Sequence, residues 1–299
     1  MCRTGESWET SRGPCVRSPA WLRRGLLGLL PVNALKTMTA FQPDSFVVSD
    51  VVPSPNFDQR KDGMQPDMIL LHYTGMADDQ AALARLCDPD AKVSAHYVVF
   101  PDGRIVQCVP ERERAWHAGV SSWDGDTDIN SHSIGIEICN PGHDHGYPPF
   151  PLRQVAAVIS LCKGILARRD TIPNDRVLAH SDVAPTRKQD PGEKFPWATL
   201  ADSGVGHWVR PAPLKLEGPR LGPGDLGSDV AQFQRMLADF GYAQPVSGDY
   251  DEAMATVVTA FQRHYRPDCV DGIADASTQM TLRALLETRA RQERAKQSI

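Results

Sequence analysis

A strongly apolar run that ends in a histidine limits how this chain can fold. The run Met68-Ile69-Leu70-Leu71 is apolar at every position, which is typical of a strand covered on both faces, and His72 follows it directly. From Val47 to about Trp208, apolar runs alternate with turn signals. We therefore predict an α/β (α+β) domain, with a mixed central sheet flanked by helices, over residues 40–208.

The same patterns predict the neighbouring elements. Ser133 to Cys139 alternates with period two, so its three isoleucines face one way and Glu137 faces the other. Apolar residues spaced by three and four, beginning at Leu152, predict an amphipathic helix over 152–168. The other expected elements are a helix at 81–86, a hairpin of strands 96–100 and 104–109, and a strand at 176–179 that presents His180.

Three separated residues form a candidate metal site. His180 and Asp190 lie ten positions apart in a turn-rich loop, and His72 would supply a third ligand from its strand end. A zinc site with three protein ligands keeps its fourth position for water, which is the catalytic form of such a site. The alternative is a chance polar trio, because separated ligands are less specific than a compact motif.

Two more residues strengthen the metal interpretation. In an extended segment Lys188 shares a face with Asp190, which puts an ammonium where a developing oxyanion needs a positive partner. Glu137 is expected to accept a proton from water activated by zinc. The alternative is that Glu137 only hydrogen-bonds a ligand histidine.

The remaining histidines have alternative structural explanations. His117 follows Trp116 and precedes Ala118-Gly119, a setting that suggests a sugar or peptide contact, whereas for His96 we favour a structural role. His132 is expected to cap or hydrogen-bond the strand that follows it. We expect no functional role for the others, namely His143 and His145 in a solvated loop, His207 near a linker and His264 on a polar helix face.

The C-terminal third predicts a separate small domain. Residues 209–221 are rich in Pro and Gly and are expected to form an interdomain linker. Three apolar helix faces then predict a three-helix domain over 222–288. The three apolar faces are Val230, Phe233, Leu237 and Phe240, then Met254, Val257 and Phe261, then Leu282, Leu285 and Leu286. The charged tail, residues 289–299, is expected to have nothing to pack against.

The N-terminal segment differs from the rest. Residues 1–37 are Arg-rich with a short apolar run broken by Pro31, which we interpret as a disordered extension or as sequence upstream of a start at Met38. A weak export signal is the alternative. No segment has the roughly 20 apolar residues of a membrane-spanning helix.

Charge and cysteine content limit the possible partners. The net charge is −5 and the basic residues are scattered, which argues against a nucleic-acid partner. The seven cysteines form no CxxC pair, so most are expected to be small buried apolar residues. The cysteine pattern therefore favours neither an oxidising nor a reducing compartment.

Five ordered stretches resemble the zinc-dependent N-acetylmuramoyl-L-alanine amidases, a family that includes phage lysozyme-like amidases and peptidoglycan recognition proteins. Together they span roughly residues 45–205, and Asp190 aligns the chain with the bacterial amidase branch. Residues 222–287 are similar to the small peptidoglycan-binding domain, although the segment Tyr265 to Val270 is less regular than usual. The five stretches are Leu70–Thr74, Val93–Tyr97, Ala115–Gly119, Ser133–Glu137 and His180–Gly192.

The resemblance implies a set of roles. One zinc ion per chain would be bound by His72, His180 and Asp190, with Glu137 and Lys188 as catalytic partners. Substrate contacts would come from Tyr73, His96, Trp116 and His117.

The expected reaction is zinc-dependent hydrolysis of the amide between N-acetylmuramic acid and L-alanine in peptidoglycan or muropeptides. The expected protein is a monomer of the cell envelope, with the cytoplasm as the alternative. One rival function is a recognition protein that binds muropeptides without cutting them. Another is a cysteine endopeptidase, which the position of Cys139 in an Ile-rich strand disfavours.

Overall fold

The structure, a computed structural model, describes residues 41–297. The predicted extension at 1–37, with Cys2 and Cys15, lies outside the described residues. The five described cysteines are free thiols. Within residues 41–297, no helix combines the length and the apolar character that crossing a membrane requires.

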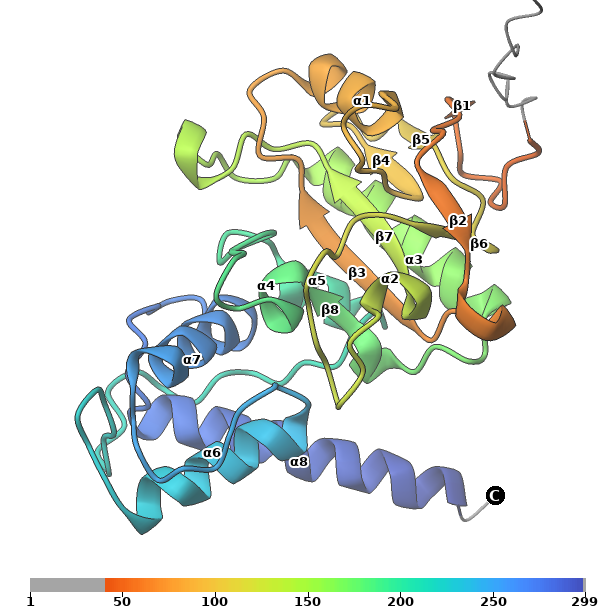
Figure 1. The fold of residues 1–299 in the computed structure, drawn as a ribbon. Coiled ribbons are helices and arrows are strands. Elements are labelled where there is room, and N and C mark those ends of the chain that lie inside the picture. The colour runs from red at the N-terminus through yellow and green to blue at the C-terminus, as the bar shows by residue number, and fades with distance from the viewer. Residues whose placement is uncertain (1–40, 298–299) are drawn as a thin grey trace, which may run out of the picture. The chain divides into compact units, whose positions relative to one another are not determined.

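A mixed six-stranded sheet forms the centre of the larger domain, as predicted (Figure 1). The strand order is β1-β5-β4-β7-β3-β8. β3 pairs in parallel with both β7 and β8, and β4 pairs in parallel with β7, while β4 and β5 form the predicted antiparallel hairpin. The strands are β1 Asp50–Val51, β3 Met68–Tyr73, β4 Tyr97–Val99, β5 Ile105–Gln107, β7 Ser133–Ile138 and β8 Val177–Ala179, with β2 Phe57–Gln59 and β6 Glu113–Ala115 in a separate antiparallel pair.

Helices occupy the connections and the C-terminal region. In the sheet domain they are α1 Asp79–Cys87, α2 Ile129–His132, α3 Leu152–Arg168, α4 His180–Val183 and α5 Trp197–Asp202. The C-terminal region holds α6 Ser228–Phe240, α7 Glu252–Tyr265 and α8 Ala276–Gln297. Short 3-10 turns lie at Lys61–Gly63, His143–His145 and Asn174–Arg176.

The long helix α3 covers one face of the sheet. The three isoleucines of β7 are fully buried there against α3, which confirms the alternation expected for this strand. The predicted apolar face of this helix was wrong at its first position, because Leu152 is 88% exposed. In its place Gln154 turns inward and donates hydrogen bonds to the carbonyl oxygens of Val99 and Cys139, so the first turn is anchored by a polar contact.

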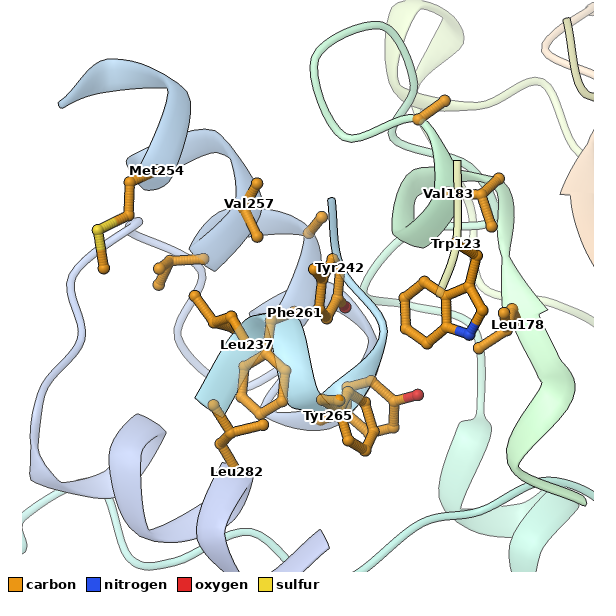
Figure 2. Close-up of a cluster of buried hydrophobic side chains, with 14 of the residues drawn as sticks. Trp123, Leu178, Val183, Leu237, Tyr242, Met254, Val257, Phe261, Tyr265 and Leu282 are labelled. Atoms are coloured by element: carbon orange, nitrogen blue, oxygen red, sulfur yellow. The ribbon is translucent and has the colours of Figure 1, made fainter. Parts of the chain in front are cut away.

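The opposite face of β3 belongs to a hydrophobic core that includes the C-terminal helices. Met68 and Leu70 of β3 lie in the same buried cluster as Trp123, Val183 and side chains of α6, α7 and α8. Figure 2 shows Trp123, Leu178 and Val183 from the sheet domain near Tyr242, with Leu237 and Phe261 beyond it. The two regions share this core, and all the described residues lie in one compact unit, while the domain boundary at 209–221 stays a prediction.

The expected linker and tail also make ordered contacts. The Ala212 amide donates to Thr281, and Leu221 pairs with Ala274 in an isolated β-bridge. The expectation that residues 289–299 have nothing to pack against was wrong, because α8 continues to Gln297 and Arg289 donates to the Phe240 carbonyl oxygen. A helix can extend beyond its apolar face into a charged segment because its backbone hydrogen bonds are internal.

Two histidines given no role are buried instead. His207 bonds the carbonyl oxygen of Leu285 in α8. His264 was expected on a polar helix face, yet it is 2% exposed and bonds Asp182 of the sheet domain. The apolar pattern of α7 did not reveal this contact, because a polar side chain is buried when a partner satisfies it.

The shared core predicts a large effect of removing one side chain. Trp123→Ala should destabilise the protein by about 3–5 kcal/mol, because Trp123 is 3% exposed and lies among residues of both regions. Urea unfolding monitored by circular dichroism measures this. Phe46→Ala is the matched control, because Phe46 is 93% exposed and its loss should change the free energy of unfolding by less than about 0.5 kcal/mol. Equal effects of the two substitutions would contradict a shared core.

Candidate active site

Three adjacent parallel strands bring the candidate residues to one edge of the sheet. The register pairs His72 of β3 directly with Glu137 of β7, and pairs Leu71 with Ala179, the last residue of β8. His180 follows Ala179 as the first residue of α4. Ligands of open α/β sheets bind outside the carboxyl ends of the strands, which is where these side chains meet.

His72, His180 and Asp190 converge on one buried point. The two Nδ1 atoms lie 2.9 Å apart, and Asp190 Oδ2 lies 3.2 Å from that of His72 and 3.0 Å from that of His180. All three side chains are buried, and their candidate ligand atoms lie within 4.8 Å of one another. The Ser181 amide donates to the Asp190 carbonyl oxygen at 3.0 Å, which holds the loop of Asp190 against α4.

The outer nitrogens of the two histidines are also engaged. His180 Nε2 lies 3.0 Å from the Ala118 carbonyl oxygen, which can only accept, so this nitrogen carries the proton. His72 Nε2 lies 3.0 Å from His117 Nδ1. The Ser133 hydroxyl donates to the Ile129 carbonyl oxygen and accepts from His117 Nε2, so His117 Nδ1 accepts from His72.

This network leaves three acceptors facing each other. With protons on the outer nitrogens, both Nδ1 atoms present lone pairs to the Asp190 carboxylate. Burial and the nearby His180 lower the pKa of His72 to about 4, so its imidazole is neutral at pH 7. Burial alone would raise the pKa of Asp190, but His180 and His72 lower it overall. Converging neutral imidazoles and an ionised carboxylate fit a cation.

Glu137 and Lys188 line a pocket beside this cluster. The pocket has a volume of about 380 Å³ and also includes the three converging residues. Glu137 Oε2 is buried and has no hydrogen-bond partner among the described residues. Burial raises the pKa of Glu137, the charge of Asp190 raises it further, and Lys188 lowers it. The sheet therefore presents a carboxyl group with a free oxygen, Oε2, that can hold or release a proton.

The residues expected to contact substrate do not all reach this pocket. Tyr73, Trp116 and His117 line it. His96 does not fit the expected substrate contact, because it is fully buried and bonded by the Gly135 amide and the Glu113 carbonyl oxygen. This is the structural role favoured for His96 from the sequence.

Several supporting residues escaped the sequence reasoning. Arg60 is buried and donates to the carbonyl oxygens of Glu111 and Ser131 beside His96. Gly135 leaves room for the His117 ring, because a Cβ atom there would lie 2.5 Å from it. The glycine inside the Ile-rich strand was the one available signal, since glycine in a strand often marks a close approach.

Tyr73 is held in place by the loop that contains His143 and His145, which was expected to be solvated. Its hydroxyl lies 3.0 Å from His143 Nδ1, and His143 Nε2 lies 3.2 Å from Glu193. The His143 ring stacks on Tyr147 at 4.1 Å. His143 therefore supports the rim of the pocket, which the spacing of the two histidines did not predict.

Comparisons with known proteins identify the family of this chain. The family model of N-acetylmuramoyl-L-alanine amidase matches residues 62–193, and that of a peptidoglycan binding domain matches residues 227–282. The N-acetylmuramoyl-L-alanine amidase AmiD of Escherichia coli (strain K12) is 41% identical over 234 residues, covering 74% of this chain and 82% of the relative. The 1,6-anhydro-N-acetylmuramyl-L-alanine amidase AmpD of Citrobacter freundii is 37% identical over 165 residues, covering 49% of this chain and 85% of the relative.

Solved structures extend the likeness to about three quarters of the chain. Escherichia coli AmiD, in complex with anhydro-N-acetylmuramic acid-L-Ala-D-gamma-Glu-L-Lys, has a TM-score of 0.64 at 38% identity and covers 77% of this chain and 93% of its own. AMPDH3 of Pseudomonas aeruginosa, in complex with an anhydromuramic pentapeptide, has a TM-score of 0.62 at 31% identity. The match covers 77% of this chain and 94% of the AMPDH3 chain. This chain therefore belongs to the N-acetylmuramoyl-L-alanine amidases, which hydrolyse the amide between N-acetylmuramic acid and L-alanine, and it carries a C-terminal peptidoglycan-binding domain.

Proposed function

We propose that one zinc ion per chain, held by His72, His180 and Asp190, serves the amidase reaction, with Glu137 and Lys188 as catalytic residues. The observation that carries this proposal is the convergence of three buried acceptors, whose atoms lie within 4.8 Å of one another in the pocket that Glu137 also lines. Three like acceptors in a buried site repel one another unless a cation lies between them.

The donor set favours zinc. Two imidazole nitrogens and one carboxylate oxygen suit zinc, whereas magnesium and calcium prefer oxygen ligands alone. Zinc in such a site supplies Lewis acidity, which activates water at neutral pH. The bonds from His180 to Ala118 and from His72 to His117 fix the ring orientations that this donor set requires.

Different side chains around the site transfer the proton and stabilise the developing negative charge. Glu137, ionised at the start, takes a proton from the attacking water and then gives it to the nitrogen of the departing L-alanine. Lys188 lines the same pocket and supplies a positive charge to the oxyanion that develops on the scissile carbonyl. The rings of Tyr73 and Trp116 line the pocket and offer apolar surface to the sugar or the peptide.

The substrate proposal extends to muropeptides that contain anhydro-muramic acid. The AmiD and AMPDH3 structures hold such molecules, and the match to this chain covers more than 90% of the length of each. The C-terminal domain would raise the local concentration of polymer at the pocket. We place the protein in the cell envelope, where that polymer lies, and as a monomer, because one chain supplies every group of the site.

Removing the aspartate should abolish stable zinc binding. Asp190→Ala is expected to weaken zinc affinity by at least about 100-fold, because the site loses its only anionic donor. Metal analysis after gel filtration, together with chelator competition, measures the loss. Asp90→Ala, at an exposed position, is the control and should bind zinc like the wild type. Full zinc content in Asp190→Ala would refute the ligand assignment.

Glu137→Gln should retain zinc but lose turnover. The expected fall in kcat is about 10²–10⁴-fold, the usual contribution of a positioned general base. Single-turnover assays on a muramyl-peptide with matched zinc content measure the fall. Wild-type turnover by this variant would show that another group carries the proton.

The pH profile gives an independent test of Glu137. Glu137 must be ionised to accept a proton, so kcat/KM should fall as pH decreases through its pKa. Burial and Asp190 raise this pKa above the ordinary value, while Lys188 and any bound zinc act in the opposite direction. The acid limb should therefore vanish in Glu137→Gln. An unchanged limb in the residual activity would assign it to a different group.

A further inference from the structure

Asp182 joins the metal-site helix α4 to the C-terminal domain. Its carboxylate is 1% exposed and accepts three short hydrogen bonds. The Ala179 amide donates at 2.8 Å from the start of the same helix. The Tyr242 hydroxyl and His264 Nδ1 each lie 2.6 Å away, and both residues belong to the C-terminal domain. Two of the three partners of this buried carboxylate therefore come from outside the sheet domain.

Both outside partners are themselves held by aromatic packing. The His264 ring lies between Trp197 of α5, at 3.6 Å, and Tyr265, at 3.7 Å, and is stacked on both. The Tyr242 ring packs edge-to-face on Trp123 at 4.9 Å. Trp123 and Trp197 belong to the sheet domain. The rings that donate to Asp182 are therefore packed against side chains of the sheet domain, which restricts their rotation.

The helix that Asp182 stabilises is too short to hold its shape through its own hydrogen bonds alone. It has four residues, and a helix of this length is unstable alone, because one turn costs more backbone entropy than its hydrogen bonds return. His180 begins it, the Ser181 amide holds the Asp190 loop, and Val183 lies in the shared core. A shift of Asp182 would therefore move both His180 and Asp190 relative to His72.

We infer that His264 and Tyr242 are positioning residues for the metal site, acting through Asp182 on α4. The inference rests on the proposed zinc site and adds residues of the C-terminal domain to its support. A buried carboxylate keeps its place when its oxygens are hydrogen-bonded and moves toward water when they are not. The domain that resembles a wall-binding module is thus also part of the framework that holds two of the three metal donors.

Two substitutions at one position test the inference. His264→Ala removes the donor and should weaken zinc affinity by about 10–100-fold, the range found when a group that supports a metal ligand is lost. His264→Asn places an amide nitrogen near the former Nδ1 and should restore most of the affinity. Tyr242→Phe keeps the ring on Trp123 and should give an intermediate loss. Chelator competition measures the affinities, and the visible spectrum of the cobalt-substituted protein reports the ligand geometry.

Val257→Ala is the matched control for general loosening. Val257 lies on the same helix as His264, is 5% exposed in the shared core, and makes no bond to Asp182. It should lower the melting temperature while leaving zinc affinity and the cobalt spectrum unchanged. Equal loss of zinc affinity in Val257→Ala and His264→Ala would overturn the inference, and so would wild-type affinity and spectrum in His264→Ala.

A metal-free measurement separates this inference from the proposed function. Hydrogen exchange of the Ser181 and Ala184 amides in apoprotein should be faster in His264→Ala than in the wild type and Val257→Ala, because these amides report α4 directly. Wild-type protein that binds no zinc would refute the proposed site. Zinc binding and turnover in the wild type, with unaltered α4 exchange in His264→Ala, would refute the positioning role alone.

Discussion

The site depends on the parallel pairing of β3 with β7 on one side and β8 on the other. Parallel strands end at the same edge of a sheet, so the residues that follow their buried runs meet without any long loop to guide them. The register pairs His72 with Glu137, and it ends β8 one residue before His180. Both faces of β3 are covered, by α3 on one side and by the core with the C-terminal helices on the other. A slip of one residue would turn His72 into the apolar layer and remove it from the site.

Hydrogen bonds then decide the chemistry that this edge can support. The Ala118 carbonyl oxygen and His117 engage the outer nitrogens of His180 and His72, so both inner nitrogens present lone pairs. Asp190 reaches the same point through a loop tied to Ser181. Glu137 Oε2 has no hydrogen-bond partner within residues 41–297, and the isoleucines beside Glu137 in the strand face the other way. The site therefore places converging acceptors next to one carboxyl group that is free to carry a proton.

The sequence predicted much of this because the sheet domain follows local rules. Runs of apolar residues gave the strands, and the spacing of three and four gave α3, since both depend on neighbours in the chain. Expectations failed where a distant partner changed the outcome, as the following residues show. Leu152 begins its stripe but faces solvent, because Gln154 anchors the first turn through Val99 and Cys139. His264 is buried because Asp182 satisfies it, and α8 runs on to Gln297, where a tail with nothing to pack against was expected.

Residue type and spacing are enough to predict the chemical groups of the site: a histidine after a buried strand, a histidine and an aspartate in one loop, and a glutamate opposite three isoleucines. These are local properties, because residue type and periodicity need no knowledge of the rest of the chain. By contrast, the burial of His96 against Gly135 and the bond between His117 and His72 depend on how the chain folds. Only the tertiary structure joined the C-terminal domain to α4 through Asp182. Such contacts link residues up to 82 positions apart, and a hydrogen bond over that separation leaves no periodic trace in the chain.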